Sequence, residues 1–218
     1  MNDLKFYFPN VSSAQLQQLK LTEEGKYSIT RPSQGYQIAS IIKKYIPNSK
    51  SYNFVDGTAG MGGDLYYVAP LFKQSVGIEK NPEHASIAQS NLEVLGIKNV
   101  KVHNMSAIDY LKDDDSDVIE NASPVFRKDF PNGIDVLWID PPWGGPDYKK
   151  YKELDLFLDG KNIGEYVKSW LDNKIAKIVF IKAPVNYNMA TVKGLGYKYK
   201  KFDVRSKHEV KFILVLIW

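Results

Sequence analysis

Residues 140–146, Asp-Pro-Pro-Trp-Gly-Gly-Pro, combine the side chains needed to hold a flat ring that carries an amine. They follow Ile134–Ile139, an apolar run whose length and β-branched residues are typical of a buried strand. The prolines and glycines end this strand in a tight turn. Asp140 and carbonyl oxygens beside the prolines can accept hydrogen bonds from an –NH2 group, and Trp143 can stack on the ring. The segment therefore predicts a site for a nucleobase; a proline-rich turn over a buried Trp143 is the alternative.

A second stretch, residues 53–64, predicts a strand that runs into a glycine-rich loop, where a ligand can approach the backbone closely. Asp56 ends this strand, and Glu79 ends the next one, 23 positions later. An acid at the second position is typical of a group that binds ribose hydroxyls. Asp56 would repel a pyrophosphate, which argues against a dinucleotide-dependent oxidoreductase. An acid there suits a positive amino group, such as the methionyl end of S-adenosylmethionine.

Composition narrows the class of protein further. The chain has 218 residues, a net charge of +4, 44% hydrophobic residues and no cysteine, which excludes disulfides and thiolate chemistry. Its three histidines are scattered, so we expect no metal site. No uncharged apolar run reaches the roughly 18 residues of a membrane span, and the N-terminus lacks the apolar core of a signal peptide. We therefore expect a soluble intracellular protein.

Strand-like and helix-like segments alternate along the chain, which predicts an α/β fold. The last two strands follow one another without a helix, which indicates an antiparallel edge. Residues 1–32 are too few for a domain, so we expect an N-terminal extension that packs on the active site of a domain formed by residues 33–218. Within this extension, we expect residues 14–21 to form a short helix and residues 25–32 to be extended or turn-like, because Pro32 disfavours helix at Arg31. The acidic run 113–117 and the residues up to Gly133 predict a solvated loop.

Three blocks of sequence together indicate a family. They are residues 24–30 (Glu-Gly-Lys-Tyr-Ser-Ile-Thr), the glycine-rich stretch 55–64, and residues 140–148 (Asp-Pro-Pro-Trp-Gly-Gly-Pro-Asp-Tyr). With these blocks the chain resembles the S-adenosylmethionine-dependent methyltransferases, and within them the trimethylguanosine synthase family of RNA cap guanine-N2 methyltransferases. The likeness extends from about Lys5 to Trp218. It implies a Rossmann-like methyltransferase fold, with a mostly parallel seven-stranded sheet, an antiparallel edge strand and helices on both faces.

The resemblance implies S-adenosylmethionine as cofactor and S-adenosylhomocysteine as product. Glycine-loop residues would line the methionyl and sulfonium side with Thr30 nearby, Glu79 would hold the ribose, and Lys80 would border the adenine. Ser106 stands where the family has an acid that contacts the adenine. The expected cofactor-binding residues are Thr30, Asp56, Gly57, Thr58, Ala59, Gly60, Glu79, Lys80, Ser106 and Asp140.

The resemblance also implies 7-methylguanosine-capped RNA as substrate. Trp143 would stack on the cationic 7-methylguanine, a cation–π contact worth about 2 kcal/mol when desolvated. The family commonly has Ser where this chain has Asp140, and an arginine where it has Val185, so we expect Lys182 to supply a phosphate contact. The expected catalytic residues are Asp140, Pro141 and Trp143, and the expected substrate-binding residues are Lys5, Ser28, Asn91, Pro142, Trp143, Tyr148 and Lys182.

The resulting prediction is an enzyme that methylates the exocyclic N2 amine of 7-methylguanosine in an RNA 5′ cap, giving di- or trimethylguanosine. Two alternatives stay open: methylation of another base amine, such as adenine N6 in DNA or RNA, and a cap-binding module that has lost methyl transfer. We expect a monomer of the cytoplasm or nucleus. Compact relatives occur in large DNA viruses, so a viral origin and the host cytoplasm are compatible with the resemblance.

Overall fold

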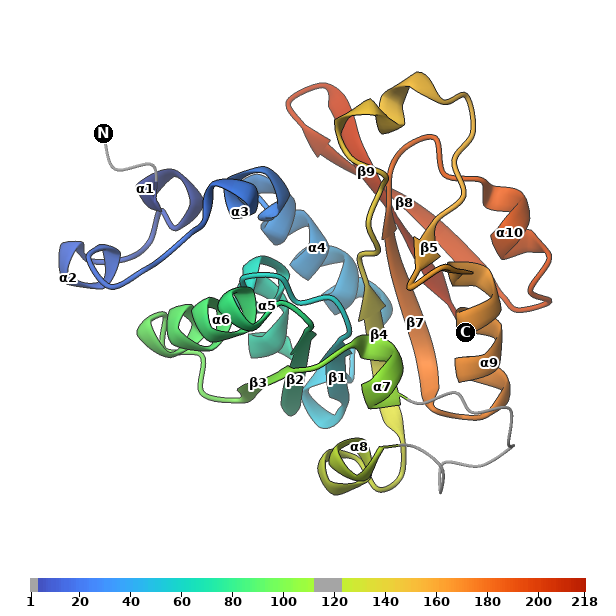
Figure 1. Ribbon diagram of the computed structural model, residues 1–218, viewed down its shortest axis with the longest axis horizontal. Helices are drawn as coiled ribbons and strands as arrows, with labels where there is room; N and C mark the ends of the chain where they lie inside the picture. Colours follow the sequence, from blue (N-terminus) through green and yellow to red (C-terminus); the bar gives the residue numbers. More distant parts are fainter. Residues whose placement is uncertain (1–3, 112–122) are drawn as a thin grey trace. The chain divides into compact units, whose positions relative to one another are not determined.

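A computed structural model describes residues 4–111 and 123–218 (Figure 1). The acidic run 113–117 lies outside the described residues. The chain divides into two compact units, one ending at Ser106 and one beginning at Ala107, and each is described by itself. The N-terminal segment belongs to the first unit. The expected division into an N-terminal extension, residues 1–32, and a methyltransferase domain, residues 33–218, stays a prediction.

The main sheet has seven strands in the order β3-β2-β1-β4-β7-β9-β8. Its paired strands are parallel except at β9, which is antiparallel to both β7 and β8. This arrangement confirms the predicted Rossmann-like class. The strands are β1 (Asn53–Asp56), β2 (Gln74–Glu79), β3 (Val100–Asn104), β4 (Ile134–Ile139), β7 (Ala176–Ala183), β8 (Tyr199–Ser206) and β9 (Glu209–Ile217).

In the first unit, three parallel strands are covered by helices that begin at the sequence signals expected of them. Helix α6 (Pro82–Val94) packs against β2 and β3, and α4 (Pro32–Tyr45) packs against α5 (Gly63–Val68). Both α4 and α6 begin with a proline, whose fixed φ suits the first helical turn. Asn81 caps α6 by accepting hydrogen bonds from the backbone N–H groups of Glu83 and His84. A short 3-10 turn, η1 (Ser49–Ser51), precedes β1, and another, η2 (Ala69–Leu71), follows α5.

The N-terminal segment of this unit is more helical than expected. It contains α1 (Leu4–Tyr7), α2 (Ser13–Leu16) and α3 (Glu23–Ser28). The extended conformation expected from residue 25 is wrong as far as Ser28, because Thr22 caps α3 by accepting from the backbone N–H of Gly25. Two glutamates in the first turn of α3 complement its dipole. The predicted helix 14–21 ends early, at Leu16.

In the second unit, β4 and β7 are parallel, and β9 adds the antiparallel pairings. Helix α9 (Ile163–Asp172) lies along β7 and buries its apolar face (Figure 1). The loop expected up to Gly133 is wrong in part, because Ser123 caps a helix, α8, whose Phe126 is buried. The remaining elements are α7 (Ala107–Leu111), α8 (Pro124–Asp129), η4 (Pro146–Lys150), the hairpin β5 (Phe157–Leu158) and β6 (Lys161–Asn162), and α10 (Met189–Lys193).

Replacing Tyr187 by Phe is expected to reduce the loss of stability at alkaline pH. Tyr187 is buried, and its hydroxyl has no hydrogen-bond partner among the described residues. Burial, with a smaller effect of Asp155, raises the pKa of Tyr187. Its contribution to stability is therefore complete below the unfolded value of about 10 and is lost as the pH rises toward the folded value.

Urea unfolding at pH 7 and at about pH 11 measures this effect. At pH 7 the Tyr187→Phe variant should be as stable as the parent or more so, because no hydrogen bond is lost. At the higher pH its free energy of unfolding should fall less than that of the parent. Tyr27→Phe, at a residue that is 91% exposed, is the matched control. An equal alkaline loss in the Tyr187 variant and the parent would contradict the prediction.

Candidate active site

The glycine loop, residues 57–63, connects β1 to α5 in the first unit. Asp56 is only 1% exposed, and its Oδ1 accepts a hydrogen bond from the backbone N–H of Thr58 at 3.0 Å. Gly60 has a φ of +52° and Gly62 a φ of +84°, which favour glycine over other residues. A Cβ atom at Gly60 would meet no atom within 4 Å among the described residues. The loop therefore leaves room for a ligand beside Gly60.

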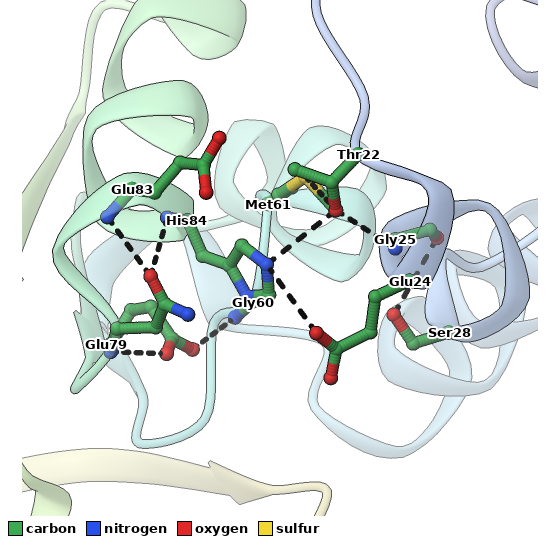
Figure 2. A network of polar contacts seen from close by, with 10 residues as sticks. Thr22, Glu24, Gly25, Ser28, Gly60, Met61, Glu79, Glu83 and His84 are labelled. Atoms are coloured by element: carbon green, nitrogen blue, oxygen red, sulfur yellow. Dashed lines mark hydrogen bonds and ion pairs between the residues drawn. The ribbon is translucent and has the colours of Figure 1, made fainter.

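Glu79 lies at the end of β2 and is hydrogen-bonded to this loop. Its Oε2 accepts from the backbone N–H of Gly60 at 2.9 Å, and its Oε1 accepts from that of Asn81 at 2.7 Å (Figure 2). A carboxylate offers about four acceptor positions, so these two bonds leave capacity for hydroxyl donors. The acid predicted to bind ribose thus lies next to the glycine loop and is held in one orientation.

The N-terminal block that carried the family resemblance packs against the start of α5. The hydroxyl of Thr30, which is buried, donates to Oδ1 of Asp64 at 2.5 Å. A Cβ atom at Gly63 would lie 2.6 Å from Cγ1 of Ile29, so only glycine allows this approach. Thr30 is therefore fixed beside the start of α5, and its contact with the cofactor stays a prediction.

A network around Thr22 joins α3 to the loop and to α6 (Figure 2). The Thr22 hydroxyl lies 3.8 Å from Sδ of Met61 and 3.5 Å from Nε2 of His84. The same His84 nitrogen lies 4.0 Å from a carboxylate oxygen of Glu24. Gly25 packs so closely that an added Cβ would overlap Cε of Met61. Sequence reasoning did not identify Met61 or His84 as residues that position this segment.

Two residues predicted to bind substrate make internal contacts in the first unit. Asn91 is 1% exposed, and its amide accepts from the backbone N–H of Lys20 at 2.9 Å and donates to the Lys20 carbonyl at 2.8 Å. Nζ of Lys5 donates to the carbonyl of Val11 at 2.9 Å. The Asn91 contacts connect the N-terminal segment to α6, and the Lys5 contact lies within the N-terminal segment. Contacts of either residue with guanine or phosphate stay predictions.

The other predicted residues of this unit differ in exposure. Gly57 and Ala59 are buried in the loop, and the backbone N–H of Ala59 donates to the carbonyl of Ile78. Ser28 and Lys80 are exposed, and Ser106 is partly exposed just before α7. The structure therefore brings the loop residues, Glu79 and Thr30 together, whereas Lys5, Ser28 and Asn91 belong to the surrounding N-terminal segment and helices.

In the second unit, Asp140 forms an ion pair with Lys182. The parallel register aligns Ile139 with Ile181, so the residues that follow them lie side by side. Nζ of Lys182 lies 2.8 Å from Oδ2 of Asp140, and the two side chains are 5% and 23% exposed, respectively. Lys182 was expected to contact phosphate, and that role stays a prediction. A charged residue follows β4 and another lies one position before the end of β7, but their pairing depends on the register of the two strands.

Trp143 is fixed by aromatic neighbours and is partly exposed. Its ring centroid lies 5.3 Å from that of Tyr148, edge to face, and 6.4 Å from that of Phe212. The indole Nε1 is buried and has no hydrogen-bond partner within the described part of the chain. Burial is the main cause of the raised pKa of Tyr148. The indole is thus held in place without being enclosed in the core.

Prolines, glycines and hydrogen bonds from Asn186 determine the conformation of the turn around Trp143. Pro141 is buried and Pro142 exposed, and Gly144 and Gly145 have φ values of +84° and +81°, respectively. The amide of Asn186 then holds η4, donating to the carbonyls of Tyr148 and Tyr151 at 2.9 and 2.8 Å. The predicted proline turn is therefore present, and its conformation is held by residues that follow β7.

Within residues 4–111 and 123–218, no group of three or more acidic or histidine side chains is arranged to hold a metal ion. In the same residues no helix is both long enough and apolar enough to cross a membrane.

The strand order and the positions of the acids and glycines define the fold class of S-adenosylmethionine-dependent methyltransferases. Among solved structures, an O-methyltransferase from Bacillus cereus in complex with SAH superimposes with a TM-score of 0.58. It is 15% identical in sequence, and the match covers 99% of this chain and 96% of that one. At this level of identity the similarity shows the fold alone.

The family model for RNA cap guanine-N2 methyltransferase matches residues 51–217, and the chain belongs to this family of methyltransferases. It is 24% identical over 222 residues to an uncharacterised protein of Acanthamoeba polyphaga mimivirus, covering 92% of this chain and 81% of the relative. It is also 24% identical over 206 residues to trimethylguanosine synthase of Saccharomyces cerevisiae. That match covers 87% of this chain but 56% of the yeast protein, so the chain spans little more than half of this relative.

Proposed function

We propose that this protein transfers a methyl group from S-adenosylmethionine to the exocyclic N2 amine of 7-methylguanosine in an RNA cap. The observation that carries the proposal is the end of β4, where Asp140 is held by Lys182 and Trp143 is held by Tyr148. A carboxylate and an indole fixed in one turn suit an amine on a flat, cationic ring. Family membership and the similarity to a trimethylguanosine synthase support this choice of base.

The cofactor would be held by the first unit. Glu79 retains acceptor capacity for the ribose hydroxyls, and the space beside Gly60 allows a close approach to the loop backbone. The negative charge of Asp56 suits the methionyl amino group, and Thr30, fixed on Asp64, would lie on the same side. Bound there, the cofactor supplies an electrophilic methyl group. These residues therefore fit S-adenosylmethionine better than a pyrophosphate-containing cofactor.

The residues of the second unit would act on the acceptor amine. Its lone pair is delocalised into the purine ring, so it is a weak nucleophile. Asp140 and a neighbouring proline carbonyl would accept its two hydrogens and favour a lone pair that is available for attack on a methyl group. The N–C bond forms as the C–S bond of the sulfonium breaks, and the alkylated amine then loses a proton to water. Most of the acceleration would come from positioning and preorganised charge.

Mass spectrometry of a 7-methylated cap dinucleotide, incubated with the protein and S-adenosylmethionine, tests the proposal. We expect one or two added methyl groups, and none on the dinucleotide that lacks the 7-methyl group. Methylation of an adenine-containing oligonucleotide instead would favour the adenine N6 alternative. Cap binding without any transfer would favour a non-catalytic module.

Beyond the cap, cations near the proline turn are expected to bind RNA phosphates. Lys149 and Lys150 are exposed on η4, and Lys149 contributes, after Lys211, to the lowered pKa of Glu209 at the start of β9. We expect Lys149→Gln with Lys150→Gln to raise KM for a capped RNA of about 20 nucleotides several-fold at low salt, and to weaken its salt dependence. Turnover of the cap dinucleotide should change little.

Steady-state kinetics at two salt concentrations measure the difference between the two substrates. Lys168→Gln is the matched control, because this exposed lysine lies on α9 and pairs with Asp172. An equal change in KM for the dinucleotide and for the longer RNA would contradict a contact beyond the cap.

A further inference from the structure

We infer that Lys182 is a positioning residue that holds the Asp140 carboxylate in the orientation needed to accept hydrogen bonds from the substrate amine. This inference rests on the proposed function. It gives the buried lysine a role in the methyl-transfer step, in place of the phosphate contact expected from sequence.

Three observations constrain Lys182. The register of β4 and β7 places it beside Asp140, the ion pair spans 2.8 Å, and its ammonium lies 5.1 Å from the ring centroid of Phe212. The side chain is 5% exposed. To reach a phosphate, it would have to leave this environment and abandon a largely buried carboxylate. Breaking such a pair is costly because it leaves one charge uncompensated.

The geometry also leaves Asp140 able to act. Oδ2 lies 2.8 Å from the ammonium, and a carboxylate has about four acceptor positions, more than one ammonium can occupy. The lysine therefore restricts rotation of the carboxylate and compensates its charge without blocking both oxygens. Phe212 lies next to both Lys182 and Trp143, since its ring centroid is also 6.4 Å from that of Trp143. Lys182 thus connects Asp140, through the ion pair, with Trp143, through Phe212.

A double-mutant cycle tests whether Lys182 acts through Asp140. The variants are Lys182→Met, Asp140→Asn and the double substitution, each assayed with the cap dinucleotide for kcat, KM and cofactor affinity. We expect Lys182→Met to lower kcat about 10- to 150-fold, the range of one hydrogen bond to a charged group. KM and cofactor affinity should stay within about threefold. In the Asp140→Asn background, Lys182→Met should cost no more than about twofold in kcat.

Two further variants separate positioning from folding. Lys182→Arg keeps the charge and should recover most of kcat. If Lys182→Met does not fold, as judged by circular dichroism, Lys182→Gln replaces it in the cycle because it keeps a donor toward Asp140. An equal fold-loss of kcat in both Asp140 backgrounds would overturn the inference. So would an unchanged kcat with a raised KM, which is the result expected for a phosphate contact.

The result of the double-mutant cycle and the test of the proposed cap substrate can be told apart. A parent protein that methylates an adenine acceptor but not the cap refutes the cap assignment, and the same cycle on adenine still decides the role of Lys182. A parent protein that methylates neither acceptor overturns both.

Discussion

Replacing Asp140 by Asn is expected to lower kcat by about two orders of magnitude, while cofactor affinity stays within a few-fold. The loss is the size typically seen when one preorganised electrostatic group is removed from a reaction centre. Asn keeps one acceptor oxygen and nearly the same volume, so the turn should be preserved. What it removes is the negative charge that would favour an amine acquiring positive charge as the N–C bond forms. Single-turnover kinetics with a cap dinucleotide, together with calorimetric titration of the cofactor, measure both quantities.

Asn is the sharper substitution because its amide oxygen can still accept a hydrogen bond from the buried Lys182, whereas Ala would remove both the charge and the acceptor. Asp147→Asn is the matched control: this acid lies in the first turn of η4, is exposed and pairs with Lys150. It should leave kcat within about twofold of the parent. If Asp140→Asn retained full turnover, the assigned role of this carboxylate would be refuted. If both variants lost activity equally, the effect would reflect the local charge and not the position of Asp140.

Replacing Trp143 by Leu is expected to raise KM for a 7-methylated cap about 30-fold. The change removes the aromatic face but keeps an apolar side chain against Tyr148 and Phe212. A desolvated cation–π contact is worth about 2 kcal/mol, and each 1.4 kcal/mol corresponds to about tenfold in affinity. The preference for the 7-methylated over the unmethylated dinucleotide should shrink by a similar factor. Fluorescence titration and steady-state kinetics with both dinucleotides provide the comparison.

Tyr151→Leu is the control for this substitution, because Tyr151 is an exposed aromatic residue just after η4. It should leave the preference for the 7-methylated dinucleotide unchanged. A Trp143→Leu variant that weakened both dinucleotides equally would indicate apolar packing and no recognition of ring charge. Such a result would favour a neutral base, such as adenine, as the acceptor.

The strands that position these residues were predictable from sequence, whereas the contacts between them were not. Strand β4 was expected at its observed bounds, because an apolar run that ends at turn signals is a local property. Helix α3 was missed because its stability depends on the Thr22 cap and on Gly25 packing against Met61, which is distant in sequence. Helix α8 was missed because acidic residues before it suggested a loop, although Ser123, Pro124 and Phe126 carried the signals of a capped, buried helix.

For the candidate site, too, the residues could be predicted from sequence but their contacts could not. The proline turn and the acid that ends β2 could be located from residue types alone. The pairing of Asp140 with Lys182 depends on the register of two parallel strands, and no local pattern fixes that register. The amide of Asn91 is hydrogen-bonded to the backbone of Lys20, a contact that no sequence pattern suggested, and its contact with guanine stays a prediction. Sequence patterns therefore identified the groups available for chemistry but not their partners.

The hydrogen bonds between Asn91 and Lys20 bear on where the protein can be shortened. The region shared with the family model starts at residue 51, yet the amide of Gln15 donates to the carbonyl of Val94, and Thr30 donates to Asp64. A fragment trimmed to the shared region would strip these partners from α5 and α6 and leave the Asn91 amide unsatisfied. We therefore expect the smallest autonomously folding piece to be larger than the stretch that homology delimits and to include Phe8 and Val11, which are buried against Leu19.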